Sequence, residues 1–290
     1  MTEADPTRSR HEMLVQLGTM FTQVSVEVYE PARPRGTVFC LHDFVGNGAD
    51  FEVLARFLVA NRFRVVCPDF YGRGQSAAMA DPKNYTSTAH LTLLMQVMQK
   101  FATRRFFVLG KGWGALMALL LVRKMQFNLA GLIVADLRLG WSVDKDPSIG
   151  EMVGEARYFP TAADAMALVR AGTEFVGVEL SVVDAIAMHR VRETAAGFTL
   201  HYDPALKDHI HRLSGRVFKV SELVEAVRCR MLYVTADALT DRRRQAVGAV
   251  TAEFGGAAIG NFSPGGRMHF TTPQELLLVL GFLTASVLPA

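Results

Sequence analysis

The chain has 290 residues, 50% of them hydrophobic, and a formal net charge of +3. This length and apolar content can bury one large core plus an insertion, and the small charge, without a basic stripe between aromatic residues, argues against a nucleic-acid partner. The three cysteines lie in apolar, strand-like runs without metal-ligand spacing, so we expect buried thiols in a reducing compartment and no metal site.

Neither end of the chain resembles a targeting or membrane segment. Residues 1–13 mix charges and contain no apolar stretch, unlike a signal peptide. The longest apolar run, ELLLVLGFLTASVL at 275–288, has the length of a buried helix and is too short to cross a bilayer. We therefore expect a cytoplasmic protein without a membrane span.

The first element expected in the chain is a strand over residues 21–30, where apolar and polar residues alternate before the turn-forming segment PARPRG. Apolar runs and helical patterns then alternate. The strands are expected at 37–44, 63–70, 105–110 and 129–137, and the helices at 50–61, 89–102 and 113–125. Short apolar strands that alternate with helices predict an α/β fold, with a mostly parallel sheet flanked by helices on both faces.

The strand–helix alternation stops after residue 139. Residues 141–220 carry helical and loop-like patterns without a strong strand, so we expect them to form a helical cap over a core of residues 1–140 and 221–290. Strand-like runs return at 230–237 and, weakly, at 256–262. A last helix is expected to begin after Thr272, because Thr272, Pro273 and Glu275 match a capping box.

The segment Gly110-Lys111-Gly112-Trp113-Gly114 joins an expected strand to an expected helix. It has the spacing of a nucleophile elbow, Gly-x-Ser-x-Gly, but glycine stands where the reactive side chain would be. Lys111 is expected to be a solvated cation at the rim of a pocket, with anion binding as the alternative. Trp113 is expected to be a packing residue.

Three further motifs complete an ordered set. LHDF (41–44) ends the first apolar strand, PDFYGRGQS (68–76) follows the second, and the acidic segment ADALTD (236–241) precedes His269 in GGRMHF. This order resembles the α/β-hydrolase fold family over almost the whole chain. GRGQSAAMADPKNYT and FTLHYDP are similar to its capped esterase and C–C hydrolase branch. GKGWGA is similar to its epoxide-hydrolase branch, whose elbow is Gly-His-Asp-Trp-Gly-Ala.

The resemblance implies roles for individual residues. Gly112 takes the nucleophile position, His269 is the base, and Asp241, or else Asp237, orients the base and stabilises its charge. The alternative for His269 is an ordinary loop histidine. No cofactor is implied.

The resemblance also implies an oxyanion hole formed by the backbone N–H groups of Phe44 and Trp113. The sequence departs from the family here, because His42-Asp43 replaces His-Gly. If Asp43 points inward, its carboxylate opposes the negative charge that develops in acyl transfer; if it points outward, it is a solvated turn residue. Both orientations remain open from the sequence.

Two further departures concern the nucleophile and the base. Gly112 cannot form an acyl- or alkyl-enzyme, and Arg267 and Met268 stand beside His269 where the family usually has Gly-His. These departures favour a non-hydrolytic protein that binds a small apolar or ester-like molecule in a capped pocket, or a protein partner. One alternative is a hydrolase, lyase or cofactor-less oxygenase in which His269 and Asp241 act as general base without a covalent nucleophile. The other is an esterase disabled by substitution at Gly112.

Overall fold

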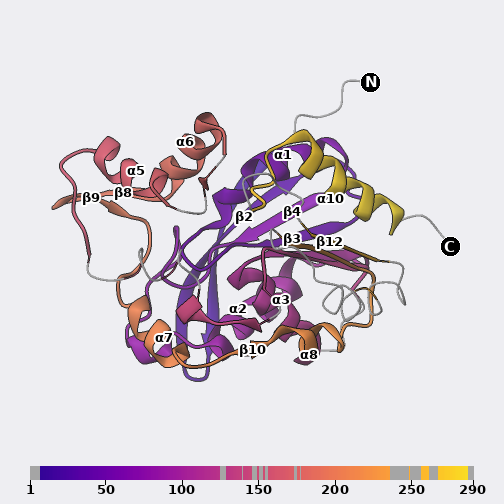
Figure 1. Cartoon of the computed structure of the whole chain (residues 1–290), viewed down its shortest axis with the longest axis horizontal. Helices are drawn as coiled ribbons and strands as arrows, with labels where there is room; N and C mark the ends of the chain where they lie inside the picture. Colours follow the sequence, from indigo (N-terminus) through magenta and orange to yellow (C-terminus); the bar gives the residue numbers. More distant parts are fainter. Residues whose placement is uncertain are drawn as a thin grey trace.

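The computed structural model describes residues 7–124, 129–138, 140–145, 149, 153, 156–172, 175–176, 178–235, 248, 256–260 and 267–286. Within these residues, eight strands form one central sheet in the order β1-β2-β4-β3-β5-β6-β11-β12 (Figure 1). In sheet order they are β1 (Thr7–Leu17), β2 (Met20–Glu30), β4 (Arg64–Pro68), β3 (Thr37–Leu41), β5 (Phe106–Lys111), β6 (Gly131–Ala135), β11 (Met231–Thr235) and β12 (Ala257–Gly260).

The sheet is mostly parallel, as the sequence predicts. The pairings of β3 with β4 and β5, of β6 with β5 and β11, and of β11 with β12 are parallel, whereas β2 pairs antiparallel with β1 and β4. Every residue of β3, β5, β6 and β11 is buried. Strands covered on both faces need apolar residues at every position, which is why these runs are continuous in the sequence.

Helices cover both faces of the sheet (Figure 1). One apolar layer contains α1 (Glu52–Ala60) and α10 (Pro273–Ala285), and the other contains α2 (Ser87–Phe101), α3 (Trp113–Lys124) and α8 (Val220–Val224). The capping box at Thr272 is present, with reciprocal hydrogen bonds to Glu275. No helix of the described part is both long and apolar enough to span a membrane.

The strand β1 was not expected from the sequence. It pairs with β2 along its whole length, from Thr7 opposite Glu30 to Leu17 opposite Met20, and Arg8 and Arg10 each form a 2.7 Å ion pair with Glu27. β1 lies at the edge of the sheet and most of its side chains are at least partly exposed. An edge strand therefore carries many polar residues and a weak apolar signal.

The region expected to form a cap contains more strand than expected. Its elements are β7 (Gly140–Trp141), η3 (Val143–Lys145), α5 (Ala162–Arg170), α6 (Leu180–His189), β8 (Val191–Thr194), β9 (Gly197–Leu200), α7 (Leu206–Leu213) and β10 (Phe218–Lys219). The β8–β9 hairpin and the β7–β10 pair form small sheets separate from the central one. In Figure 1, α5, α6, β8 and β9 lie together to one side of the central sheet. The division into core and cap remains our proposal.

Candidate functional site

The turn between β5 and α3 is built from glycines for steric reasons. Gly112 has a φ of 49°, a backbone conformation that side-chain-bearing residues rarely adopt, and its N–H donates to the carbonyl oxygen of Ala135 at 2.9 Å. A Cβ on Gly114 would lie 2.1 Å from the carbonyl oxygen of Leu41. The sharp turn therefore directs the N-terminus of α3 toward the loop that follows β3.

Asp43, in that loop, points inward. Its Oδ1 accepts hydrogen bonds from the backbone N–H of Phe44 at 2.7 Å and of Trp113 at 2.8 Å. These are the two N–H groups that the resemblance assigns to an oxyanion hole. The positive end of the α3 dipole adds to this stabilisation of the carboxylate, because Trp113 is the first residue of the helix. The carboxylate thus occupies the position expected for a substrate oxyanion.

The same carboxylate occupies the space beside Gly112. A Cβ on Gly112 would lie 2.3 Å from Oδ1, 2.4 Å from Cγ and 2.5 Å from Oδ2 of Asp43. Arg267 lies on the other side, with its Nη1 3.6 Å from Asp43 Oδ2. A side chain at position 112 would therefore overlap the carboxylate of Asp43 in its present position.

His42 fixes the loop that carries Asp43. It is fully buried, accepts a hydrogen bond from the N–H of Phe70 at Nε2 (3.0 Å), and has its Nδ1 2.7 Å from the carbonyl oxygen of Asp43. Because Nε2 accepts, the proton is on Nδ1, which donates. Burial lowers the pKa of His42 to about 3, so the ring is neutral at physiological pH. We assign it a structural role.

Arg73 and His209 pack against Phe44, in the loop that carries Asp43. Arg73 is fully buried; its Nε donates to the carbonyl oxygen of Phe44 at 2.8 Å and its guanidinium lies 4.7 Å from the Phe44 ring centre. His209, from α7, lies 5.8 Å from the ring of Phe44 and 5.2 Å from that of Trp113. The ring of Phe44 is therefore in contact with buried groups from distant parts of the chain.

His269 is buried and lies beside Lys111. Its Nδ1 is 3.3 Å from Lys111 Nζ, and its ring stacks on the ring of Phe175 with the ring centres 5.1 Å apart. The backbone N–H of His269 donates to the Glu275 carboxylate at 3.1 Å. An ammonium group can only donate, so Nδ1 is the acceptor in this contact. Lys111 is 5% exposed, and the expectation of a solvated cation at a pocket rim is wrong. The Lys111 side chain turns inward because its Nζ contacts His269, in the loop before α10.

Asp241 and Asp237, the acids expected to orient His269, lie outside the described residues. Their pairing with His269 remains a prediction. The described residues contain no group of three or more His, Cys, Asp or Glu side chains that could hold a metal ion.

Asp136, which follows β6, was not expected at the site from the sequence. Its φ of 54° is unusual for a residue other than glycine, and its Oδ2 accepts the N–H of Met268 at 2.7 Å. Its Oδ1 is buried and has no hydrogen-bond partner among the described residues. Burial raises the pKa of Asp136 to about 7, although the charge of Lys111 acts in the opposite direction. An acid directly after the carboxyl end of a parallel strand was the available signal.

The raised pKa of Asp136 predicts a pH-dependent stability. Between about pH 4 and about pH 7 the folded state binds this proton more tightly than the unfolded state, so this contribution to stability is lost as the pH rises through that window. Asp136→Asn keeps an oxygen acceptor for Met268 but cannot ionise. We expect the variant to become more stable relative to the wild type between about pH 5 and about pH 7.5, as measured by urea unfolding.

Burial also raises the pKa of Asp69 to about 7, so Asp69 contributes a similar pH dependence to stability. This contribution is the same in the wild type and in Asp136→Asn, and it cancels in the difference between them. A stability difference between variant and wild type that is independent of pH would contradict the assignment to Asp136.

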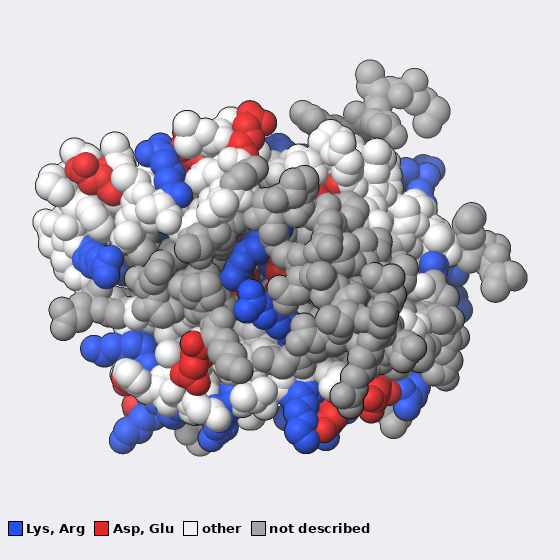
Figure 2. Space-filling model, viewed as in Figure 1, with Lys and Arg blue, Asp and Glu red and all other residues white. Residues whose placement is uncertain are grey.

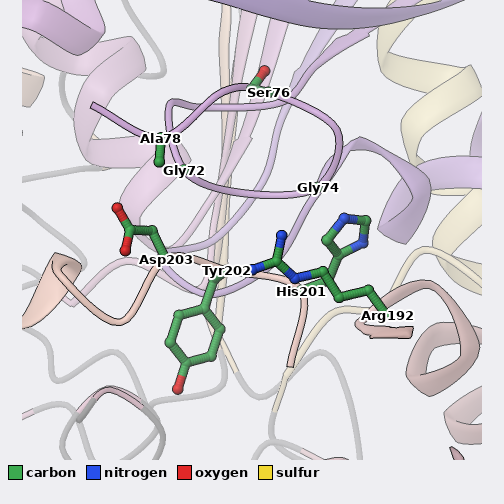
Figure 3. A pocket seen from close by; sticks show the side chains of 8 residues that line it. All are labelled: Gly72, Gly74, Ser76, Ala78, Arg192, His201, Tyr202 and Asp203. Atoms are coloured by element: carbon green, nitrogen blue, oxygen red, sulfur yellow. The ribbon is translucent and has the colours of Figure 1, made fainter. Parts of the chain in front are cut away.

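Surface pockets lie away from these residues, among them the following two. One, of about 90 Å³, lies under the loop of residues 72–78, where Arg192 and His201 extend next to Tyr202 (Figure 3). The other is a groove of about 410 Å³ between α1 and α6. Figure 2 shows Lys and Arg side chains at a hollow near the centre of the displayed face.

The chain is similar to known hydrolases in sequence. A family model described as "Serine aminopeptidase, S33" matches residues 32–139. A 3-hydroxybutyrate-oligomer hydrolase of Cupriavidus necator is 26% identical over 182 residues, which cover 61% of each protein. A serine hydrolase-like protein of Dictyostelium discoideum is 22% identical over 125 residues, 43% of this chain and 34% of that protein. The chain thus spans less than two thirds of the length of the curated relatives it matches.

The similarity in structure covers nearly the whole chain. An α/β hydrolase from Novosphingobium aromaticivorans superimposes with a TM-score of 0.79, at 20% identity over 97% of this chain and 99% of that one. A thioesterase domain from the curacin biosynthetic pathway gives a TM-score of 0.71, at 18% identity over 95% of this chain and 99% of that one. At these identities the comparison shows the fold.

Proposed function

We propose that this protein, which has the α/β-hydrolase fold, binds a small apolar or ester-like molecule at the carboxyl ends of its strands without transferring acyl groups through residue 112. The main support is the double hydrogen bond from Phe44 and Trp113 to Asp43 Oδ1. Acyl transfer develops negative charge on a substrate oxygen, and these two N–H groups already bind a negative oxygen of the protein.

The contact between Lys111 and His269 also supports this proposal. A histidine that activates a nucleophile becomes an imidazolium ion, which an acid normally stabilises. An ammonium group 3.3 Å from Nδ1 opposes that charge. Together with the absence of a side chain at Gly112, this contact disfavours the covalent route through residue 112 and the hypothesis that His269 activates a water molecule while Lys111 is charged.

The position of Asp43 also favours a second candidate function. An aspartate carboxylate can act as a nucleophile: attack on the acyl carbon of an ester would form a mixed anhydride and release the alcohol. Asp43 lies where a nucleophile at position 112 would stand, and Oδ1 is held by two N–H groups that could stabilise the oxyanion formed when water attacks the Asp43 carbonyl carbon of this anhydride. Asp43 would then replace the missing nucleophile from a different loop.

One experiment in oxygen-18 water distinguishes the two candidates. The wild type is incubated with p-nitrophenyl butyrate, and separately with a fluorophosphonate; binding is measured by calorimetry, release of p-nitrophenol by absorbance, and labelling by peptide mass spectrometry. We expect saturable binding without burst, turnover, phosphonate adduct or oxygen-18 at Asp43. The matched control is Asp43→Asn, which has nearly the same shape but is a poor nucleophile.

Each positive chemical result has a defined meaning. Turnover with oxygen-18 in Asp43, lost in Asp43→Asn, would establish the second candidate. A stoichiometric phosphonate adduct on any serine or cysteine would overturn the non-hydrolytic proposal. Failure of the ester to bind would contradict the proposed ligand class.

A further inference from the structure

Lys111 is a buried primary amine at the centre of the candidate site. It is 5% exposed, and its Nζ is within hydrogen-bond distance of His269 Nδ1. In the described part of the chain no carboxylate forms an ion pair with it. A primary amine with a proton acceptor at hydrogen-bond distance is suited to nucleophilic chemistry, because its proton can pass to that acceptor before the amine attacks.

A carboxyl group lies close to this amine. Lys111 pairs with Ala135, the last residue of β6, and Asp136 is the residue that follows this strand. The charge of Lys111 influences the ionisation of Asp136, whose Oδ1 is buried without a partner among the described residues. The left-handed φ of Asp136 holds its side chain at the end of the strand, and strained backbone of this kind is common at functional sites.

We propose that Lys111 forms an imine with an aldehyde or ketone group of the bound ligand, with His269 as the proton acceptor and Asp136 as the proton donor. This inference rests on the proposed function, because it names the ligand class of the same site. It requires neither a nucleophile at Gly112 nor an oxyanion hole. The aromatic groups around the site, Phe175 against His269 and Trp113 next to Gly112, suit an apolar carbonyl compound.

The reaction balances without an oxidant. Lys111 first passes a proton to His269 Nδ1; its lone pair then forms the C–N bond while the carbonyl π electrons move to oxygen. A proton shift from nitrogen to oxygen gives the carbinolamine. The C–O bond breaks as Asp136 protonates the leaving hydroxyl, which releases water and leaves an iminium ion. The proton on His269 then restores the Asp136 carboxyl, so ammonium and carbonyl become iminium and water.

The ionisation of Asp136 suits its role. Burial raises the pKa of this carboxyl to about 7, so a substantial fraction is protonated at neutral pH and can donate. Among the described residues, four groups face this carboxyl. They are Lys111 on β5, Asp43 in the loop after β3, and both Arg267 and the Met268 N–H in the loop that carries His269. Imine formation is therefore expected to slow as the pH rises through about 7.

Reductive trapping tests the proposal. The full chain is incubated at neutral pH with 2-pentanone and sodium cyanoborohydride, and alkylation of each lysine is followed by peptide mass spectrometry. Lys219, whose side chain is 73% exposed, and Lys100 on the surface of α2 are internal references. We expect Lys111 to be alkylated at least about tenfold faster than Lys219, and the adduct to be absent in Lys111→Arg.

Asp136→Asn separates a role in the reaction from a role in packing. We expect slower trapping at Lys111 with unchanged labelling of Lys219, and loss of the inflection near pH 7 from the rate profile. Equal labelling of Lys111 and Lys219 in the folded wild type would overturn the imine proposal. Calorimetry with p-nitrophenyl butyrate then decides the proposed function separately, since an ester that still binds leaves that function intact.

Discussion

Gly112→Ser is expected to destabilise the protein and to leave ester hydrolysis near background. A left-handed φ of 49° costs about 1–3 kcal/mol for a residue with a side chain. The new Cβ would also stand 2.3–2.5 Å from the carboxyl atoms of Asp43, and displacing a packed group costs about 1–3 kcal/mol more. Urea unfolding and p-nitrophenyl ester turnover measure the two effects. Gly112→Ala is the matched control, because it adds the same Cβ without a hydroxyl.

Adding Asp43→Gly should reverse part of this effect. The second change removes the overlapping carboxylate and releases the N–H groups of Phe44 and Trp113 for a substrate oxygen. We expect the double mutant to be more stable than additivity predicts, by about 0.5–3 kcal/mol. Its ester turnover should exceed that of either single mutant by a factor on the order of 10²–10³, the value of an oxyanion-hole donor.

Two results would contradict this account. Stability effects that add within about 0.5 kcal/mol would show that Asp43 does not occupy the space beside residue 112. Rapid ester hydrolysis by Gly112→Ser alone would instead favour the hypothesis of an esterase disabled at this position.

Arg73→Met is expected to destabilise the protein strongly. Arg73 donates to the carbonyl oxygens of Phe44 and Tyr71 at 2.8 and 2.9 Å, and its Nη1 is 3.0 Å from His90 Nε2. Methionine fills similar volume but leaves these acceptors buried and unpaired, each at a cost of about 1–3 kcal/mol. We expect a loss on the order of 3–5 kcal/mol in urea unfolding, and faster amide exchange of the Phe44 N–H.

Arg212 provides a matched control for Arg73. It also donates to two carbonyl oxygens, those of Pro82 and Tyr85, both at 2.9 Å, but it is exposed on α7. Water can replace its hydrogen bonds, so Arg212→Met should cost less than about 1 kcal/mol. Similar losses for the two variants would show that burial of Arg73 does not matter.

The sequence by itself determined the features that depend on neighbouring residues. Buried strands such as β3 and β5 need an apolar residue at every position, so they are visible as continuous runs. The capping box at Thr272 is local, and so is the turn at Gly112. These short-range patterns were sufficient to predict the mostly parallel sheet flanked by helices, together with the loops in which candidate site residues lie.

Only the tertiary structure decided what the site contains. Asp43 turns inward because it meets the N–H of Trp113, 70 residues away, and Lys111 is buried because it meets His269, 158 residues away. The edge strand β1 and the β8–β9 hairpin have too few buried residues to give a strong apolar pattern. Orientation and burial of a polar side chain depend on partners that are distant in sequence, and no local pattern encodes those partners.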